Sequence, residues 1–311
     1  MTRMIDNINT INYSFIIPHH NSPDLLERCL DSIPQRQDIE IIVVDDNSDP
    51  YKKPHISRTD IRLIYIDAEH TRGAGRARNY GLKEAKGKWL IFADADDFYE
   101  KDFILELDKF KDTDFDIVIW DHYGTFDINT KRWKDGDAHL YMKALSYEPN
   151  NAIIQKALKF RVNAPWNKMY RASFIEKHKF QYEEKAKGND AFFSMSAIEK
   201  AYKVGFIPKR LYYWVKTEGG LTHGKSKEGL KETLTIGKAD KIKIRNRAWG
   251  ALVPLHSGIK TVYNKYGLRF TLSHYSKKFF NGVPWLLVYF FRYRYVKIAK
   301  NIISKHQSIK Q

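Results

Sequence analysis

Residues 89–97 read Trp89-Leu90-Ile91-Phe92-Ala93-Asp94-Ala95-Asp96-Asp97. A short run of apolar β-formers that ends directly in three carboxylates predicts a buried strand opening into a polar turn. The three carboxylates repel one another unless water or a cation screens them, and a hard divalent cation with oxygen ligands, Mg²⁺ or Mn²⁺, is their natural partner. The alternative is a solvated acidic turn in which Asp97 caps the next helix.

Further apolar runs of the same kind precede and follow this stretch. They predict strands over Tyr13–Ile17, Ile39–Val44, Ile61–Ile66 and Ile117–Trp120, with helices over Pro23–Ile33 and Arg76–Ala85 between them. Continuous apolar strands that alternate with helices indicate an α/β fold with a mostly parallel central sheet covered by helices on both faces. In such sheets ligands bind outside the carboxyl ends of the strands.

Polar residues follow the predicted strands at those ends, in Pro18-His19-His20-Asn21, in Asp45-Asp46 and at Asp67. Asp46 could accept a hydrogen bond from a base of the uracil type, although an Asx-turn is the simpler interpretation. Gly73-Ala74-Gly75-Arg76-Ala77-Arg78-Asn79 offers a close backbone approach and two guanidinium groups for phosphates or for the carboxylates. It lacks the ending of a P-loop and precedes the best strand, so it is not a dinucleotide fingerprint.

Together these segments resemble family 2 glycosyltransferases, which have the GT-A fold. The resemblance rests on residues 15–21, 29–33, 40–48, 75–82 and 92–97, in matching order and spacing. It implies that Pro18, His20 and Asn21 line the nucleotide pocket, with His20 standing where the family usually has Tyr. Asp46 would contact the base, Arg78 would help to bind the nucleotide, and Asp94 and Ala95 would lie near the ribose. Asp96 would bind the metal, and Asp97 would lie near the acceptor or support the loop.

The family's catalytic base is the Asp of a Glu-Asp pair, which matches Gly188-Asn189-Asp190 here. Asp190 would accept the proton of the acceptor hydroxyl during direct displacement at the anomeric carbon, so that the anomeric configuration is inverted. Asn189 replaces the usual Glu. Without the resemblance, a helix N-cap would be the preferred interpretation of this pair.

The acceptor half of the family is matched by Pro165-Trp166-Asn167-Lys168 and by the segment around His223. Trp166 could stack on an acceptor sugar, Lys168 could contact a phosphate, and His223 could complete the metal site. The simpler alternatives are core packing for Trp166 and a surface loop for His223.

The charge of the chain is strongly positive, with a net value of +16, and basic and aromatic residues dominate from residue 226. Trp285–Phe291 followed by Arg292, Arg294 and Lys297 is typical of a membrane interface, and an anionic membrane surface is therefore a candidate partner. An ordinary helical cap on the catalytic domain is the alternative. The N-terminus carries no apolar leader and no window is long enough to span a bilayer, so we expect a cytoplasmic protein with the inner face of the plasma membrane as a peripheral site.

These features predict a GT-A domain over residues 1–225, with a nucleotide-sugar half at about 13–120 and an acceptor half at about 121–225. A helical region follows over 226–311. The expected activity is metal-dependent hexosyl transfer from a nucleotide diphosphate sugar, with a UDP-sugar favoured, to a glycan or lipid-linked acceptor in capsule or lipopolysaccharide synthesis.

Two other classes of protein remain open from the sequence. A nucleic-acid-binding protein would suit the charge, but no binding motif is present and we expect no nucleic acid partner. A nucleotidyltransferase would suit the carboxylates, but the Gly-rich opening loop of that class is missing. Loss of activity in a GT-A protein is a third alternative, suggested by Asn189.

Overall fold

The computed structural model describes residues 10–67, 73–185, 189–216, 237–252, 259–280 and 283–308. These residues form two compact units. The first comprises residues up to Asp135 together with Ala164–Thr217, and the second comprises Gly136–Asn163 together with Glu218–Gln311. The predicted domain boundary at about residue 225 lies outside the described residues and stays a prediction.

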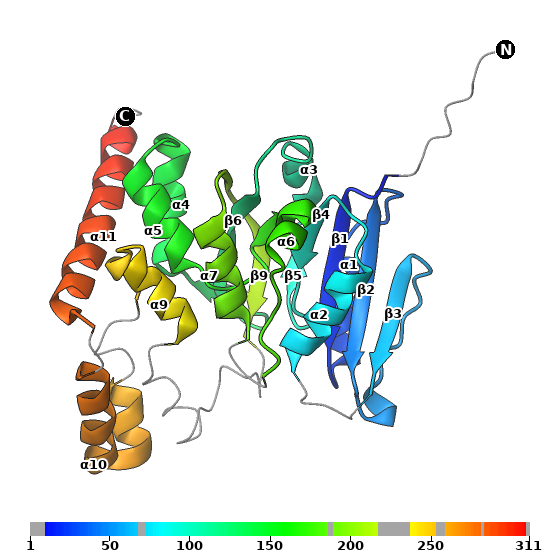
Figure 1. The fold of residues 1–311 in the computed structure, drawn as a ribbon, viewed down its shortest axis with the longest axis horizontal. Coiled ribbons are helices and arrows are strands. Elements are labelled where there is room, and N and C mark those ends of the chain that lie inside the picture. Colours follow the sequence, from blue (N-terminus) through cyan, green and yellow to red (C-terminus); the bar gives the residue numbers. More distant parts are fainter. Residues whose placement is uncertain are drawn as a thin grey trace. The chain divides into compact units, whose positions relative to one another are not determined.

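The first unit is built on one sheet whose N-terminal strands are all parallel (Figure 1). They are β1 (Tyr13–His19), β2 (Ile39–Asp46), β3 (Ile61–Ile66) and β4 (Trp89–Phe92), in the order β3-β2-β1-β4. The central strand β1 pairs with β2 from Tyr13↔Ile39 to His19↔Asp45 and with β4 from Tyr13↔Trp89 to Ile16↔Phe92. The carboxyl ends of β1, β2 and β4 therefore meet at one edge, as the sequence predicts.

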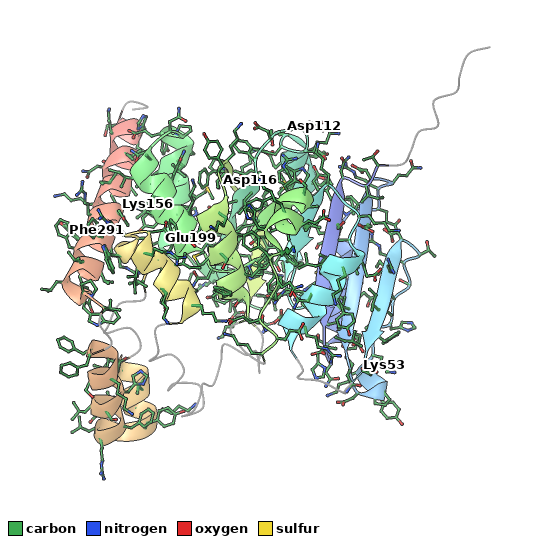
Figure 2. The ribbon with its side chains drawn as sticks, in the orientation of Figure 1. Lys53, Asp112, Asp116, Lys156, Glu199 and Phe291 are labelled. Carbon is green, nitrogen blue, oxygen red and sulfur yellow. The ribbon has the colours of Figure 1, made fainter. Side chains whose placement is uncertain are left out.

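The sheet continues past β4 through strands of mixed direction. β8 (Lys168–Arg171) runs antiparallel to β4 and to β6 (Ile117–Asp127), while β9 (Val204–Val215) runs parallel to β6. The short strands β5 (Phe98–Tyr99) and β7 (Arg132–Lys134) pair with β9 and β6. Asp116, labelled in Figure 2, joins β6 to β9, because its carboxylate accepts hydrogen bonds from the backbone N–H groups of Tyr202 (2.8 Å) and Lys203 (3.0 Å).

Helices cover both faces of the sheet, which confirms the predicted α/β fold of GT-A type. Alternate strand residues point to opposite faces. One face packs on α1 (Pro23–Asp31) and α3 (Phe103–Asp108) through a large core that includes Phe15, Ile17, Val43 and Trp89. The other face packs Ile42, Val44 and Ile66 on Ala77 of α2 (Ala74–Glu84). The remaining helices of this unit are η1 (Pro50–Lys52), α6 (Ala172–His178) and α7 (Asp190–Lys200).

Three strands are longer than the sequence predicts, and one of them is β2, which runs on to Asp46 instead of ending at Val44. Pro18 was expected to end the first strand, but β1 runs on to His19. The backbone of Pro18 is oriented like that of Ile16, so the N–H that proline lacks would point toward β4. Pairing between β1 and β4 ends at Ile16↔Phe92, so no hydrogen bond of the sheet is lost at Pro18. β6 extends to Asp127 instead of ending at Trp120, because β7 and the distal half of β9 pair with its polar second half.

The described part of the second unit is helical, which confirms the predicted helical C-terminal region. It contains α4 (Asp137–Tyr147), α5 (Ala152–Arg161), α9 (Lys238–Arg245), η2 (Trp249–Ala251), α10 (Ile259–Phe279) and α11 (Trp285–Ser308). Within this unit α11 packs on α4, α5 and η2. None of the described helices is both long enough and apolar enough to span a membrane.

Candidate active site

Three carboxylates gather where β4 ends. Oxygen atoms of Asp94, Asp96 and Asp97 all lie within 4.8 Å of one another. Asp94 and Asp96 are half-buried and Asp97 is buried. Burial, and then the charges of Asp96 and Asp94, raise the pKa of the Asp97 carboxyl well above its usual range. Crowded like charges on hard oxygen donors are what a divalent cation relieves, so these residues fit Mg²⁺ or Mn²⁺.

Strand β9 fixes the backbone of this acidic loop. The backbone N–H of Asp94 donates to the Tyr212 hydroxyl at 3.0 Å, and the Asp97 carboxylate accepts from the Val215 N–H at 2.7 Å. On the other side, the Arg28 guanidinium donates to the backbone carbonyl of Asp96. The bond from the Val215 N–H ties Asp97 to β9, and the roles that the family resemblance implies for Asp97 stay predictions.

Asp46 is the last residue of β2, and only one of its two carboxylate oxygens has a hydrogen-bond partner among the described residues. Its Oδ2 accepts from the Gly73 N–H at 2.6 Å, and its backbone carbonyl contacts Nδ1 of the exposed His20 at 3.0 Å. Its Oδ1 is buried and has no hydrogen-bond partner among the described residues. A buried acceptor without a partner is costly, so this oxygen is available to a ligand N–H such as that of a nucleotide base.

A buried hydrogen-bond network beside Asp46 was not predicted from the sequence. His19 Nδ1 lies 2.7 Å from the Asp45 carboxylate, and its Nε2 accepts from the Ser22 N–H at 3.2 Å, so Nδ1 carries the proton. Asp45 Oδ2 also accepts from the Ser48 N–H at 3.1 Å. Asn21, which has a left-handed φ of 55°, accepts at its side-chain oxygen from the Asp49 N–H at 2.8 Å. The network holds the two strand-end turns together beneath the predicted nucleotide site.

The Arg78 guanidinium joins the acidic loop to the segment that carries Asp190. Its Nη2 pairs with the Asp94 carboxylate and its Nη1 donates to Asn189 Oδ1 at 3.2 Å. The guanidinium also lies over the Tyr182 ring, 5.3 Å from its centroid. Arg78 is only 4% exposed. The resemblance implied a contact with the nucleotide, and that role stays a prediction; the bonds within the protein describe a positioning role.

Asn79, the next residue in this motif, clamps the same segment. Its side-chain amide donates to the Tyr182 carbonyl and to the Glu184 carboxylate, each at 3.0 Å, and its oxygen accepts from the Tyr182 N–H at 2.8 Å. Gly75 allows the approach, because a Cβ there would lie 2.3 Å from the Glu183 carbonyl oxygen. Gly75 and Asn79 therefore hold residues 182–184 against α2.

Asp190 is the first residue of α7 and is half-buried. Asn189 occupies the N-cap position, but its side chain makes no capping bond; it donates to the Lys185 carbonyl at 3.0 Å and accepts from Arg78. The cap interpretation of Asn189 is therefore wrong for its side chain, and the base role of Asp190 stays a prediction.

Lys168 is fully buried next to this segment. Its Nζ donates to the Ala164 carbonyl at 2.6 Å and to Asn167 Oδ1 at 2.8 Å. Burial lowers the pKa of Lys168 to about 7, and the nearby charge of Asp190 acts in the opposite direction. Lys168 is thus poised to change charge close to neutral pH, beside the predicted base.

Trp166 lies within the large hydrophobic core and is 6% exposed. Its ring stacks on Tyr212, with centroids 4.8 Å apart, and meets the His122 ring edge at 4.8 Å. This placement agrees with the core-packing alternative. Pro18 and Ala95 are buried, with Ala95 in the same core cluster. His223, predicted as a further metal ligand, lies outside the described residues.

Sequence reasoning missed Tyr182 and Tyr212, which hold the two sides of the site. Tyr182 stacks on Phe193 of α7 with centroids 4.0 Å apart and lies beneath Arg78. Tyr182 is not set apart by a motif, since tyrosine is frequent in this chain, with 19 residues. Tyr212 belongs to the aromatic run Leu211-Tyr212-Tyr213-Trp214, which resembles part of the family's acceptor half but gives Tyr212 no role by itself.

Comparison with known proteins places the chain in a family. Residues 14–179 match the family model described as "Glycosyl transferase family 2". The putative glycosyltransferase EpsH of Bacillus subtilis is 28% identical over 210 residues, covering 65% of this chain and 60% of EpsH. The poly(ribitol-phosphate) beta-glucosyltransferase of Bacillus spizizenii is 29% identical, covering 66% of this chain but 32% of that protein. The chain thus spans less than two thirds of these relatives.

The fold is shared with a solved structure. Residues 1–349 of Staphylococcus aureus TarS, crystallised with UDP-GlcNAc, align with 96% of this chain and 92% of theirs at a TM-score of 0.62 and 17% identity. The family model covers more than half of the 311 residues, including β1, β2, β4, β8 and the acidic loop. The chain belongs to glycosyl transferase family 2.

Proposed function

We propose that this chain transfers a sugar from a UDP-sugar to a hydroxyl group of a surface polysaccharide or polyol-phosphate acceptor, with inversion at the anomeric carbon. One observation carries the proposal: the carboxylates of Asp94, Asp96 and Asp97 are joined through Arg78 to the segment that begins α7 at Asp190. A site for the leaving diphosphate and a site for a base are thereby held in one arrangement.

The donor half of the proposal rests on β2 and β4. Asp46 offers a buried oxygen without a partner in the described residues, which suits an N–H of uracil. Asp96, with Asp94 beside it, would hold Mg²⁺ or Mn²⁺. When bound, such an ion supplies positive charge to the departing diphosphate. A TarS structure contains UDP-GlcNAc, which supports a UDP-sugar as the donor class.

The acceptor half of the proposal rests on Asp190. Its carboxylate takes the proton of the acceptor hydroxyl while that oxygen forms a bond to the anomeric carbon, and the bond from this carbon to the diphosphate oxygen breaks. Direct displacement converts an α-linked donor into a β-linked product. Two relatives support this outcome through their names, a poly(ribitol-phosphate) beta-glucosyltransferase and a poly(ribitol-phosphate) beta-N-acetylglucosaminyltransferase. Arg78 and Lys168 place two basic groups near Asp190.

The test is a transfer assay with UDP-glucose, UDP-galactose and UDP-GlcNAc against poly(ribitol phosphate) and short glycan acceptors, read out by NMR of the new anomeric proton. We expect a β-linked product with one donor, formed with Mn²⁺ or Mg²⁺ and lost in Asp190→Asn. Ser196 is half-buried on the same helix, so Ser196→Asn is the matched control and should retain activity. An α-linked product, or full activity in Asp190→Asn, would refute the proposed mechanism.

A further inference from the structure

The positive charge of the chain is concentrated in its last 71 residues. No Asp or Glu follows Asp240, whereas residues 241–311 contain 15 Lys and Arg. The first 240 residues therefore carry the other 38 basic residues against all 37 acidic ones, a net charge of +1. The first 240 residues are nearly neutral, and 15 of the 16 net positive charges belong to residues 241–311.

Exposed apolar side chains are concentrated in the same region. Among the described residues, 16 large hydrophobic side chains are exposed, and ten of them lie between Ile259 and Tyr293. Single exposed hydrophobic residues are normal on protein surfaces, but ten within 35 positions mark an interaction surface.

Helix α11 is apolar on two opposite faces over its first half. At 100° per residue, one face carries the buried residues that pack within the second unit: Val288, Tyr295, Ala299, Ile302 and Ile303. The opposite face carries Leu286, Phe290 and Tyr293, which are 86%, 56% and 67% exposed. Farther along the same outward face the residues become basic, with Lys297 and Lys300 exposed.

Helix α10 also has an exposed apolar face. Beyond the break at Gly267, where φ is 76°, Leu268, Leu272 and Phe279 fall within about 40° of one another around the helix axis. They are 61%, 62% and 54% exposed. Arg269 and Lys277 belong to the same helix.

We propose that the outward faces of α10 and α11, defined by Leu268, Leu272, Phe279, Leu286, Phe290 and Tyr293, form a docking surface for an anionic phospholipid bilayer. Aliphatic and aromatic side chains enter the boundary between headgroups and acyl chains, while the surrounding lysines and arginines pair with lipid phosphates. A helix of this kind lies in the plane of the membrane.

The charge distribution selects this occupant over the alternatives. A second copy of the chain would bring the same basic region, with no acidic residue after Asp240, against this surface. Like charges brought together in that way are destabilising. Nucleic acid would satisfy the charge, but it would leave the aliphatic side chains Leu268, Leu272 and Leu286 in water.

The experiment is flotation of the full-length protein with vesicles of phosphatidylcholine alone or with 30% phosphatidylglycerol (on the order of a third anionic lipid, enough to set up the surface potential). We expect binding to the anionic vesicles, weaker binding as salt rises, and at least roughly tenfold weaker partitioning for Leu286→Asp/Phe290→Asp. Leu105→Asp/Tyr202→Asp removes two exposed hydrophobic residues of the first unit, 57% and 88% exposed, and should bind like the wild type. Circular dichroism melting confirms that both variants are folded.

Three results would overturn the proposal. One is the absence of binding to anionic vesicles, and a second is equal loss in the two double variants. The third is a wild-type dimer that becomes a monomer in Leu286→Asp/Phe290→Asp, since a second copy would then cover the surface. Sugar transfer to a soluble acceptor should be unchanged in Leu286→Asp/Phe290→Asp, so membrane docking and the proposed catalytic function succeed or fail separately.

Discussion

Replacing Arg78 tests whether one buried guanidinium holds the acidic loop and the Asp190 segment together. Arg78→Met removes the ion pair with Asp94, the bond to Asn189 and the contact with the Tyr182 ring. Breaking a fully buried ion pair costs about 3–5 kcal/mol. The Asp94 side chain is 31% exposed and can be rehydrated, so we expect a smaller loss of about 2–3 kcal/mol in the free energy of unfolding.

Arg78→Met should change kcat more than it changes donor binding. If the loops separate by about 1 Å, the fall in kcat should be on the order of 100-fold, with a smaller change in KM for the donor. Arg78→Lys keeps the charge but cannot make two diverging bonds, so it should recover part of the stability and little of the kcat.

Arg76 provides the matched control for this prediction. It is equally buried, at 4% exposure, and donates to the Asp67 carbonyl at 3.0 Å, away from Asn189. Urea unfolding and UDP-release kinetics should show a loss of stability in Arg76→Met with kcat within about threefold of the wild type. Equal effects of the two substitutions on kcat, or no effect of Arg78→Met, would refute the positioning role.

Three further predictions concern the segment around Asp190. Gly75→Ala places a methyl group 2.3 Å from the Glu183 carbonyl oxygen, so it should lower the free energy of unfolding by about 1–3 kcal/mol and reduce kcat. Gly136→Ala is the control and should change neither, because a Cβ there meets nothing within 4 Å. Equal melting temperatures of the two variants would contradict this prediction. Burial lowers the pKa of Lys168 to about 7, so the unfolded chain binds more protons than the folded chain between pH 7 and about 10. The free energy of unfolding of the wild type should therefore rise by up to about 1.4 kcal/mol per pH unit relative to Lys168→Met, measured by urea titrations at pH 7.5 and 9. Parallel pH profiles of the two proteins would show that the pKa is not lowered. Asn189→Glu should strengthen the contact with Arg78 and raise the melting temperature, and an unchanged or lower value in differential scanning calorimetry would contradict that pairing.

The fold could be predicted because local pattern and global arrangement agree in the N-terminal half. Ile41–Val44 and Trp89–Phe92 are continuous apolar runs, which are typical of a sheet buried on both faces. Pro18 misled the prediction of one boundary, since its cost depends on whether a neighbouring strand requires its N–H, and that is decided by tertiary structure.

The candidate site was only partly predictable. Strand-end carboxylates such as Asp46 and Asp96 follow from topology, because parallel strands end at a common edge. The bond from Arg78 to Asn189 joins residues 111 positions apart, and the register between α2 and the segment before α7 sets it. The low pKa of Lys168 likewise depends on complete burial, which no local pattern of four residues reveals.

Titration calorimetry of UDP into the full-length chain with Mn²⁺ tests the central claim most directly. The account predicts one UDP bound per chain in the presence of Mn²⁺, a loss of that binding in Asp96→Ala, and its retention in Asp190→Asn. UDP binding that is indifferent to Mn²⁺ and to Asp96→Ala would contradict the assignment of the acidic loop as the diphosphate site.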